Sequence, residues 1–298
     1  MRFEDFVNKI YFPDMESRLK ENTVQTKKYI INDKVLTYFG NLRINDIKPS
    51  DIRKWQTTLI EKGYANTYLR TIQNQLTALF NYAVKFYDLK TNPCKKAGSM
   101  GKKEASEMLF WTKQEYLKFI DAVMDKPISF YAFEVLYWLG LRLGEFLSLT
   151  PADFDFKKQT ISITKSYQRL KGEDVVTEPK TPRSNRVILM PDFLCEEMQE
   201  YLGMLYEIQP EDRIFTITKS YLHKEMDRGS KLAGVKRIRI HDLRHSHVSL
   251  LIEMGVSALA IAERTGHETI DIVYRYAHLF PTKQVEMVEK LSLEKGEY

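Results

Sequence analysis

Apolar and polar residues in the first hundred positions repeat with the 3.6-residue period of an α-helix. This pattern predicts one short helix near the N-terminus and three longer ones, over residues 2–11, 23–39, 50–62 and 66–91. The last helix has a broad apolar stripe made of Leu69, Ile72, Leu76, Leu79, Phe80, Ala83 and Val84. Helices with one apolar face each indicate a small helical bundle.

Capping residues predict where these helices begin and end. Thr23, Ser50 and Asn66 carry side chains that can accept a hydrogen bond from the first turn of a helix. Gly40 and Gly63 stand where the periodic pattern stops, as glycines commonly do at a helix C-terminus. We therefore expect helices that start at these polar residues and stop at these glycines.

The polar stretch CKKAGSMGKKEASE, residues 94–107, loses the apolar period. Its two glycines and four lysines are typical of an interdomain linker. We predict an all-α helical-bundle domain over residues 1–97, a linker over residues 98–107 and a second domain over residues 108–298. A C-terminal tail is expected from about residue 281.

The second domain combines helical and strand patterns. Thr112 followed by Glu115 is a capping-box signature that predicts a helix to about Val123, and residues 128–140 predict an apolar helix. Period-two alternation predicts strands at residues 160–164, near residues 175–176 and at residues 186–189. Helices return after Pro191, so we expect a mainly α (α+β) domain with a small antiparallel sheet.

Charge changes this picture more than composition does. The first hundred residues hold 17 Lys and Arg against 10 Asp and Glu, whereas the remainder holds 28 against 30. A basic first third favours a polyanionic partner, nucleic acid first, although an ordinary basic surface explains it equally well. The 43% of hydrophobic residues indicates a soluble globular protein.

Several classes of protein are disfavoured. Cys94 and Cys195 are too few and too far apart for a disulfide framework or a cysteine-based zinc site. The N-terminus, MRFEDFVNKI, does not resemble a signal peptide, and no apolar run has the length of a bilayer span. We therefore expect a cytoplasmic protein without a membrane segment.

The first candidate site residue is an arginine in the apolar, glycine-flanked segment LGLRLGEF. Burial of Arg142 in such surroundings is costly unless its guanidinium meets an anion. Glu145, three residues later, can orient that guanidinium from the same helical face. A simple ion pair between the two residues explains the segment as well as a phosphate site does.

The second candidate is the segment HDLRH, in which His241 and Arg244 share a helical face. A guanidinium can hold two oxygens of a phosphate, and an imidazole can add a hydrogen bond or move a proton. His241 and His245 also have the spacing of the HExxH zinc motif. Asp242 is a shorter acid than that motif requires, and Arg244 would place positive charge beside a cation, so we expect no metal or cofactor.

The third candidate is a tyrosine that follows a Gly-His pair. Tyr276 lies nine residues after His267, in the segment YRYAH. A phenol oxygen beside cations that bind phosphate can act as a nucleophile. Tyr274 is the rival, and residues two apart on a helix point in different directions, so both are not expected at one site. An ordinary packed aromatic remains the alternative for either tyrosine.

Taken in order, these signals resemble the tyrosine recombinase, or phage integrase, family. They are an Arg in LGLRLGE, a Lys at a β-hairpin, HxLRH, GH, and a Tyr nine residues later. The resemblance covers the whole chain, with a helical core-binding domain followed by a catalytic domain. The stretch TYLR, NQLTALFNYAVKFYDL and NP further resembles integrases of Gram-positive phages and integrative conjugative elements.

The resemblance implies a role for each matching residue. Arg142 and Arg244 match the two arginines that hold the scissile phosphate. His241 matches the first residue of the HxxR motif. His267 matches the His/Trp position that contacts a phosphate oxygen. Tyr276 matches the nucleophile, and its spacing from the Gly-His pair favours it over the other tyrosine of that segment.

Other positions match with supporting roles. Lys180, in EPKT, matches the hairpin lysine that protonates the leaving 5′ oxygen, and Lys171 at the other turn of the sheet is its alternative. Glu145 matches a supporting acid, and His245 follows the motif arginine as in many members. Val273 replaces a threonine often found three residues before the nucleophile, which affects one local hydrogen bond.

The family reaction is a transesterification at a DNA phosphodiester, through a 3′-phosphotyrosine and a free 5′-hydroxyl, and it integrates or excises a mobile element. The resemblance implies double-stranded DNA attachment sites, a homotetramer and a Holliday-junction intermediate, with an excisionase or a host DNA-bending protein as further partners. Many members carry an additional N-terminal arm-binding domain, whereas this sequence resembles the family from the core-binding domain onward.

Three points stay open in the sequence. A type IB topoisomerase-like nicking-closing enzyme would use the same chemistry without exchanging strands. A non-catalytic DNA-binding protein could keep the fold, although the complete set of candidate catalytic residues disfavours it. The tail carries Val285, Val288 and Leu291 on one helical stripe, which fits exchange between neighbouring subunits and packing within one subunit equally well.

Overall fold

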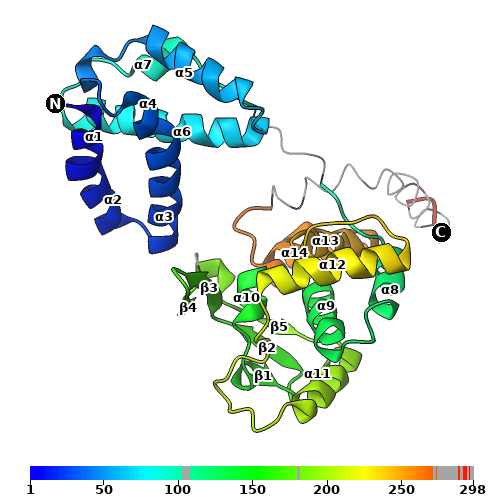
Figure 1. Ribbon diagram of the computed structural model, residues 1–298. Coiled ribbons are helices and arrows are strands. Elements are labelled where there is room, and N and C mark those ends of the chain that lie inside the picture. The colour runs from blue at the N-terminus through cyan, green and yellow to red at the C-terminus, as the bar shows by residue number, and fades with distance from the viewer. Residues whose placement is uncertain are drawn as a thin grey trace. The chain divides into compact units, whose positions relative to one another are not determined.

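The computed structural model describes residues 1–102, 108–179 and 182–270, together with Val273, Val288, residues 291–293 and Lys295. The chain divides into two compact units, Met1–Glu107 and Met108–Tyr298 (Figure 1). The N-terminal unit and the C-terminal unit each surround a large hydrophobic core of their own. The fold-class prediction of a helical bundle and a mainly helical domain with a small antiparallel sheet is confirmed.

The N-terminal unit consists of helices in its described residues. Two of them are continuous but contain a π-helical segment: α1 (Phe3–Phe6), η1 (Val7–Tyr11) and α2 (Phe12–Arg18), then α3 (Glu21–Ile30), η2 (Ile31–Leu36) and α4 (Thr37–Phe39). The chain continues through η3 (Ile44–Asp46), α5 (Pro49–Glu61), α6 (Asn66–Phe86) and α7 (Pro93–Ala97). All four predicted helices are present, and the first continues to Arg18 rather than stopping near residue 11.

The predicted N-caps are wrong by one to three residues. Thr23 and Ser50 lie inside α3 and α5, and Asn66 is the first residue of α6. At the start of α5 the carboxylate of Asp51 accepts a hydrogen bond from the backbone N–H of Lys48, 2.9 Å away. Several polar residues compete for each helix start, so the sequence places the helix but not its first residue.

Aromatic rings dominate the core of the N-terminal unit. The ring of Phe3 contacts Phe39 and Phe80, and Phe39 contacts Trp55 at a centroid distance of 5.4 Å. The indole N–H of Trp55 donates to the carbonyl oxygen of Lys34, 2.8 Å away, inside the π-helical segment η2. Helix α5 is therefore fixed to the bend of the second helix by a hydrogen bond as well as by packing.

The polar stretch at residues 94–107 begins as part of this unit. Asn92 caps α7 by accepting a hydrogen bond from Cys94, and α7 packs on α5 and α6. Ala97 and Met100 are buried in the same core. The chain therefore stays packed to about Met100, further than its polar composition indicates.

The C-terminal unit contains most of the described secondary structure. Its helices are α8 (Lys113–Asp121), α9 (Pro127–Leu139), α10 (Leu143–Leu147), α11 (Asp192–Met204), α12 (Lys219–Ala233), α13 (Asp242–Glu253) and α14 (Ala258–Thr265). Helix α9 packs against α8, α10, α11 and α13 and lies in the middle of the unit (Figure 1). The predicted capping box at the start of α8 is confirmed, since Thr112 and Glu115 exchange hydrogen bonds.

The described strands form two separate antiparallel sheets. One sheet has the order β1 (Phe154–Asp155), β2 (Thr160–Ile163) and β5 (Arg186–Leu189), and β3 (Ser166–Leu170) pairs only with β4 (Glu173–Thr177). Lys171 and Gly172 join β3 to β4 with positive φ angles of 52° and 89°, as a two-residue hairpin turn requires. The short turn η5 (Pro182–Ser184) then leads into β5. Of the tail residues in the predicted stripe, Val288 and Leu291 are described, and both are exposed.

A pair of glutamates lies between α9 and α11 in the C-terminal unit. Glu134 is buried, and its Oε1 accepts a hydrogen bond of 2.6 Å from the Tyr116 hydroxyl. Burial and the neighbouring Glu134 carboxyl raise the pKa of Glu197 to about 8. Glu197 is therefore largely protonated in the folded protein at pH 7, whereas it would be ionised in the unfolded chain.

This pair predicts a pH-dependent stability. A raised folded pKa means that the folded protein binds a proton that the unfolded chain releases between about pH 4.5 and pH 8. Stability should therefore fall across that range in the wild type. Glu197→Gln keeps the hydrogen-bonding capacity without the charge, so it should be more stable than the wild type at pH 8.5, by roughly 1–2 kcal/mol. Thermal unfolding of the full chain at pH 5 and pH 8.5 measures the difference.

The matched control is Glu196→Gln, the exposed neighbour on the same helix, which should leave the pH profile unchanged. Equal pH profiles for Glu197→Gln and the wild type would contradict the conclusion that Glu197 is protonated in the folded protein.

Candidate active site

The first arginine follows a left-handed turn at the end of α9. Gly140 has φ 59°, and a Cβ atom at this position would lie 2.5 Å from Cδ2 of the His247 ring. Arg142 then occupies the N-cap of α10 in an extended conformation. The sequence predicted Arg142 and Glu145 on one helical face, but Arg142 lies just before the helix, and Glu145 reaches back to it as an N3 carboxylate does in a capping box.

Polar contacts from three parts of the chain hold the Arg142 guanidinium. Its Nη1 donates to Oε1 of Glu145 at 2.7 Å and to Oγ of Ser184 at 3.3 Å. Its Nη2 donates to the carbonyl oxygen of Gly266 at 2.7 Å. The side chain remains 36% exposed, so it is fixed in direction while its outer edge reaches solvent. The predicted ion pair with Glu145 is present and serves to orient the arginine.

The second arginine is buried beneath the first. Arg244 on α13 is only 2% exposed. Its Nη1 donates to the carbonyl oxygen of Gly140 at 2.8 Å, and its Nη2 donates to that of Thr265 at 2.5 Å. Arg142 and Arg244 thus bind the carbonyl oxygens of consecutive residues, Gly266 and Thr265. The structure therefore brings together two arginines that are about a hundred residues apart in sequence.

His267 follows directly on this carbonyl pair. Its Nδ1 lies 2.8 Å from Oγ1 of Thr265, and the residue is almost fully buried. Burial and the positive charges of Arg244 and Arg142 together lower its pKa to about 3. The imidazole is therefore neutral at pH 7, in a place where positive charge is concentrated.

The two histidines of the HDLRH segment lie at the same site. Burial and the charge of Arg244 lower the pKa of His241, and burial and His241 lower the pKa of His245 to about 4. The two rings contact edge to face, with centroids 5.0 Å apart. Asp242 between them accepts hydrogen bonds from the backbone and the guanidinium of Arg239, and its Oδ1 lies 3.8 Å from Nε2 of His245. Among the described residues, no three His, Cys, Asp or Glu side chains gather as a metal ion would require.

Glu145 is the buried anion of the site, and it binds two arginines. Besides Arg142, it receives Arg186, whose Nη2 lies 2.9 Å from Oε2 and whose Nη1 lies 3.2 Å from Oε1. Burial alone would raise the pKa of Glu145, but hydrogen bonds and charge from Arg186 and Arg142 outweigh it and lower the pKa. Glu145 is therefore ionised and links two guanidinium groups.

Two residues of the site, Arg186 and Ser184, were not predicted from the sequence. Arg186 shares one face of β5 with the buried Ile188, and a cation at such a position needs an anionic partner. The alternation of that strand was therefore a usable signal for Arg186. Ser184 gives no comparable signal, because its contact with Arg142 depends on how the turn before β5 folds.

Two predicted site residues, Lys180 and Tyr276, lie outside the described residues, as does Tyr274. Described residues that are close to them in sequence lie at the site or near it. Ser184 contacts Arg142, and Val273 packs in a small apolar cluster with Val248 of α13 and Ile261 and Ala262 of α14.

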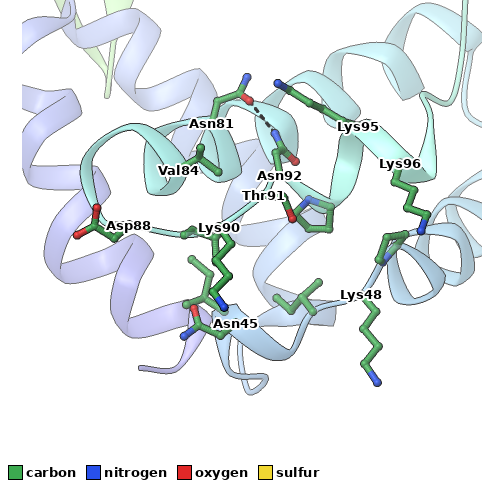
Figure 2. A pocket seen from close by; sticks show the side chains of 15 residues that line it. Asn45, Lys48, Asn81, Val84, Asp88, Lys90, Thr91, Asn92, Lys95 and Lys96 are labelled. Carbon is green, nitrogen blue, oxygen red and sulfur yellow. Dashed lines mark hydrogen bonds between the residues drawn. The ribbon is translucent and has the colours of Figure 1, made fainter.

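A second candidate region lies in the N-terminal unit. A hollow of about 900 Å³ has an apolar floor that includes Ile44, Ile47, Val84, Leu89 and Pro93. Figure 2 shows four lysines around it, and they are Lys48, Lys90, Lys95 and Lys96. Asp88 is the one acidic residue of its lining, and within the described part of the chain none of the four lysines forms an ion pair. We call this feature the lysine hollow.

Comparison with known proteins identifies relatives of both units. Residues 104–283 match the family profile described as "Phage integrase family", and residues 2–60 match "Phage integrase, N-terminal SAM-like domain". The chain is 34% identical to the ICEBs1 integrase of Bacillus subtilis, over 95% of this chain and 80% of that protein. It is 25% identical to the transposase from transposon Tn916 of Enterococcus faecalis, over 93% and 75%.

Solved structures with the same fold include integrases in complex with DNA. The Tn1549 transposon integrase with transposon right end DNA has a TM-score of 0.77 and 21% identity, covering 95% of this chain and 98% of that one. A lambda integrase tetramer bound to a Holliday junction has a TM-score of 0.71 and 17% identity, covering 93% and 77%. Across the described ranges of the present chain, no helix has the length and apolar character of a membrane span.

The turn at Gly140 predicts a specific steric effect. Gly140→Ala should lose stability for two reasons, the left-handed backbone and the collision with the His247 ring. Gly234→Ala is the matched control, since Gly234 also ends a helix with φ 64° but has no atom within 4 Å of its added Cβ. Gly140→Ala should cost about 1–3 kcal/mol more than the control, measured by urea unfolding of the full chain. Equal losses would show that the contact with His247 is not restrictive.

Proposed function

The chain belongs to the phage integrase family and is a tyrosine site-specific recombinase, and from this premise we propose that Arg142, Arg244 and His267 bind the scissile phosphate of DNA. The observation that carries the proposal is the attachment of both arginines to consecutive carbonyl oxygens, at Thr265 and Gly266, next to His267. Guanidinium groups fixed in this way can hold phosphate oxygens without first losing side-chain freedom.

Tyr276 is the proposed nucleophile. Its phenol oxygen attacks the phosphorus, the bond from phosphorus to the 5′ oxygen breaks, and a 3′-phosphotyrosine and a 5′-hydroxyl result. Because one phosphate ester replaces another, the energy of the broken bond is conserved and the step is reversible. The protein's main contribution is positive charge around the phosphate oxygens as the transition state forms.

Proton transfers complete the step. His241 is positioned beside Arg244, and its lowered pKa leaves it neutral at pH 7, so its imidazole can accept the phenol proton. Lys180 is proposed to protonate the departing 5′ oxygen. Ser184, four residues after Lys180 in sequence, contacts Arg142, which supports this role for Lys180. Glu145 and His245 have supporting roles, Glu145 for the arginines and His245 for His241.

The exchange of strands sets the number of partners. Recombination of two duplexes breaks four strands, and one tyrosine for each strand requires four copies of the chain on two attachment sites. The lambda integrase tetramer bound to a Holliday junction supports this arrangement by its shared fold. We place the reaction in the cytoplasm, where a bacterial chromosome and its mobile elements lie, with an excisionase or a host DNA-bending protein setting its direction.

The lysine hollow is proposed to contact the DNA backbone. Its four lysines lie before α5, after α6 and in α7, and among the described residues none of them forms an ion pair (Figure 2). Such lysines attract phosphates and release the counterions around them. They would add affinity without reading the base sequence, because phosphate contacts carry no sequence information.

The test of the nucleophile is a covalent adduct. A nicked duplex carrying the attachment site loses its short 5′-hydroxyl fragment after cleavage, so the phosphotyrosine adduct accumulates and is counted on a denaturing gel. Tyr276→Phe should reduce adduct formation by a factor of at least about 10³, and Tyr274→Phe should leave it near the wild-type level. The reverse result would make Tyr274 the nucleophile.

The same preparation separates strand exchange from simple nicking and closing. Wild-type protein should recombine two attachment sites on separate DNA molecules. A topoisomerase-like enzyme would relax a supercoiled plasmid that carries one site and yield no recombinant product. Neither the matched relatives nor the fold supports that alternative, since the relatives are integrases and a transposase.

The lysine hollow predicts a change in salt dependence. If Lys95 and Lys96 each contact a phosphate, Lys95→Ala/Lys96→Ala should reduce the slope of log affinity against log salt by about 2. The matched control is Lys9→Ala/Lys28→Ala, since these lysines are already paired with Asp5 and Glu16 in the same unit. DNA binding by the full chain, measured at four salt concentrations, gives both slopes. Similar slopes for the two double variants would place the DNA contact elsewhere.

A further inference from the structure

Arg186 is the most deeply buried cation that contacts Glu145. Its side chain is 7% exposed, and it binds both oxygens of that carboxylate. Its Nε donates to the carbonyl oxygen of Arg264 at 2.9 Å, and its Nη1 donates to that of Ser184 at 3.0 Å. One side chain of β5 thus fixes the ends of two segments that reach the site, the turn before β5 and the end of α14.

Arg186 contacts the residues around Arg142 rather than Arg142 itself. Glu145, Ser184 and Gly266 supply the acceptors of Arg142. Arg186 binds the first two of these residues, and a Cβ atom added to Gly266 would lie 3.1 Å from its Nη1. Arg186 therefore binds two of the three residues that accept hydrogen bonds from the Arg142 side chain and lies beside the third.

Counting charges shows what Arg186 adds beyond packing. A lone pair of Arg142 and Glu145 would be neutral, because the carboxylate would cancel the guanidinium. With Arg186 the group of three carries a charge of +1. Arg186 and Glu145 are 7% and 3% exposed, whereas Arg142 is 36% exposed, so the surplus charge meets solvent at Arg142.

We propose that Arg186 is a positioning residue for the cleavage reaction, which neutralises Glu145 so that the charge of Arg142 remains available to the scissile phosphate. The proposal rests on the proposed function, because it requires Arg142 to bind that phosphate. In this proposal Glu145 fixes the orientation of the Arg142 guanidinium. Arg186 neutralises the charge of Glu145, so that this contact does not weaken the binding of phosphate.

A purely structural role is the competing explanation. Removal of Arg186 leaves a buried carboxylate with one partner fewer, which alone would destabilise the fold. Stability therefore does not separate the two roles, whereas the charge of the substrate does. A methylphosphonate at the scissile position carries no negative charge, so it does not depend on a surplus positive charge at Arg142.

The experiment compares adduct formation on phosphate and methylphosphonate versions of the nicked duplex, using the full chain. Arg186→Gln should slow cleavage of the phosphate substrate by roughly 10–100-fold and cleavage of the methylphosphonate substrate by less than about threefold. Arg228→Gln is the matched control, since Arg228 also pairs with a buried glutamate, Glu225, on a helix away from the site. It should leave both rates unchanged.

A second variant tests the charge count directly. Glu145→Gln/Arg186→Gln removes one negative and one positive charge. The net charge of the group therefore returns to +1, and no buried carboxylate is left unpaired. The double variant should cleave the phosphate substrate faster than Arg186→Gln does. A structural role for Arg186 predicts the opposite, since the double variant loses more contacts.

The outcomes distinguish this inference from the proposed function. Equal slowing of Arg186→Gln on both substrates, or a double variant slower than the single one, would overturn the role of Arg186. Arg142→Gln should show the same preference for the methylphosphonate substrate. If it does not, or if the wild type forms no adduct through Tyr276, the proposed function itself fails, whatever Arg186 does.

Discussion

Guanidinium groups that lie close together repel one another, and in the C-terminal unit the arginines of the site are held by oxygen acceptors. Arg244 binds the carbonyl oxygens of Gly140 and Thr265, and Arg142 binds that of Gly266 and the carboxylate of Glu145. These contacts join the end of α9, the start of α10 and the end of α14. Oxygen acceptors from these elements thus offset the cost of placing the charged groups in the protein.

The sequence predicted the helices well, for reasons that lie in individual residues. The apolar stripe from Leu69 to Ala83 is long and regular, and α6 follows it with those residues buried. Thr112 and Glu115 form their capping box because both partners lie within one turn. Signals of this kind depend on residues that are close in sequence, so they can be found in the sequence alone.

Other features depend on contacts between distant residues and were missed or misplaced. Arg186 binds Glu145, which is 41 residues away in sequence. Glu197 lies close to Glu134 through the packing of two helices, which no local sequence pattern indicates. The helix that was predicted to start at Thr23 starts at Glu21, because several polar residues there compete and neighbouring packing decides. The strands expected in one small antiparallel sheet form two, because β3 and β4 make a separate sheet of two strands among the described residues. Tertiary contacts override local preference at each of these places.

The neutral state of His267 has a consequence for how the protein senses an anion. Its low pKa reflects burial and the repulsion by Arg244 and Arg142. A polyanion that docks beside these groups offsets the repulsion and moves the imidazole's proton affinity upward. Ligand association is then linked to proton uptake, and by thermodynamic reciprocity a more acidic solution strengthens the complex. At the proposed phosphate site, His267 thus links the binding of an anion to the acidity of the solution.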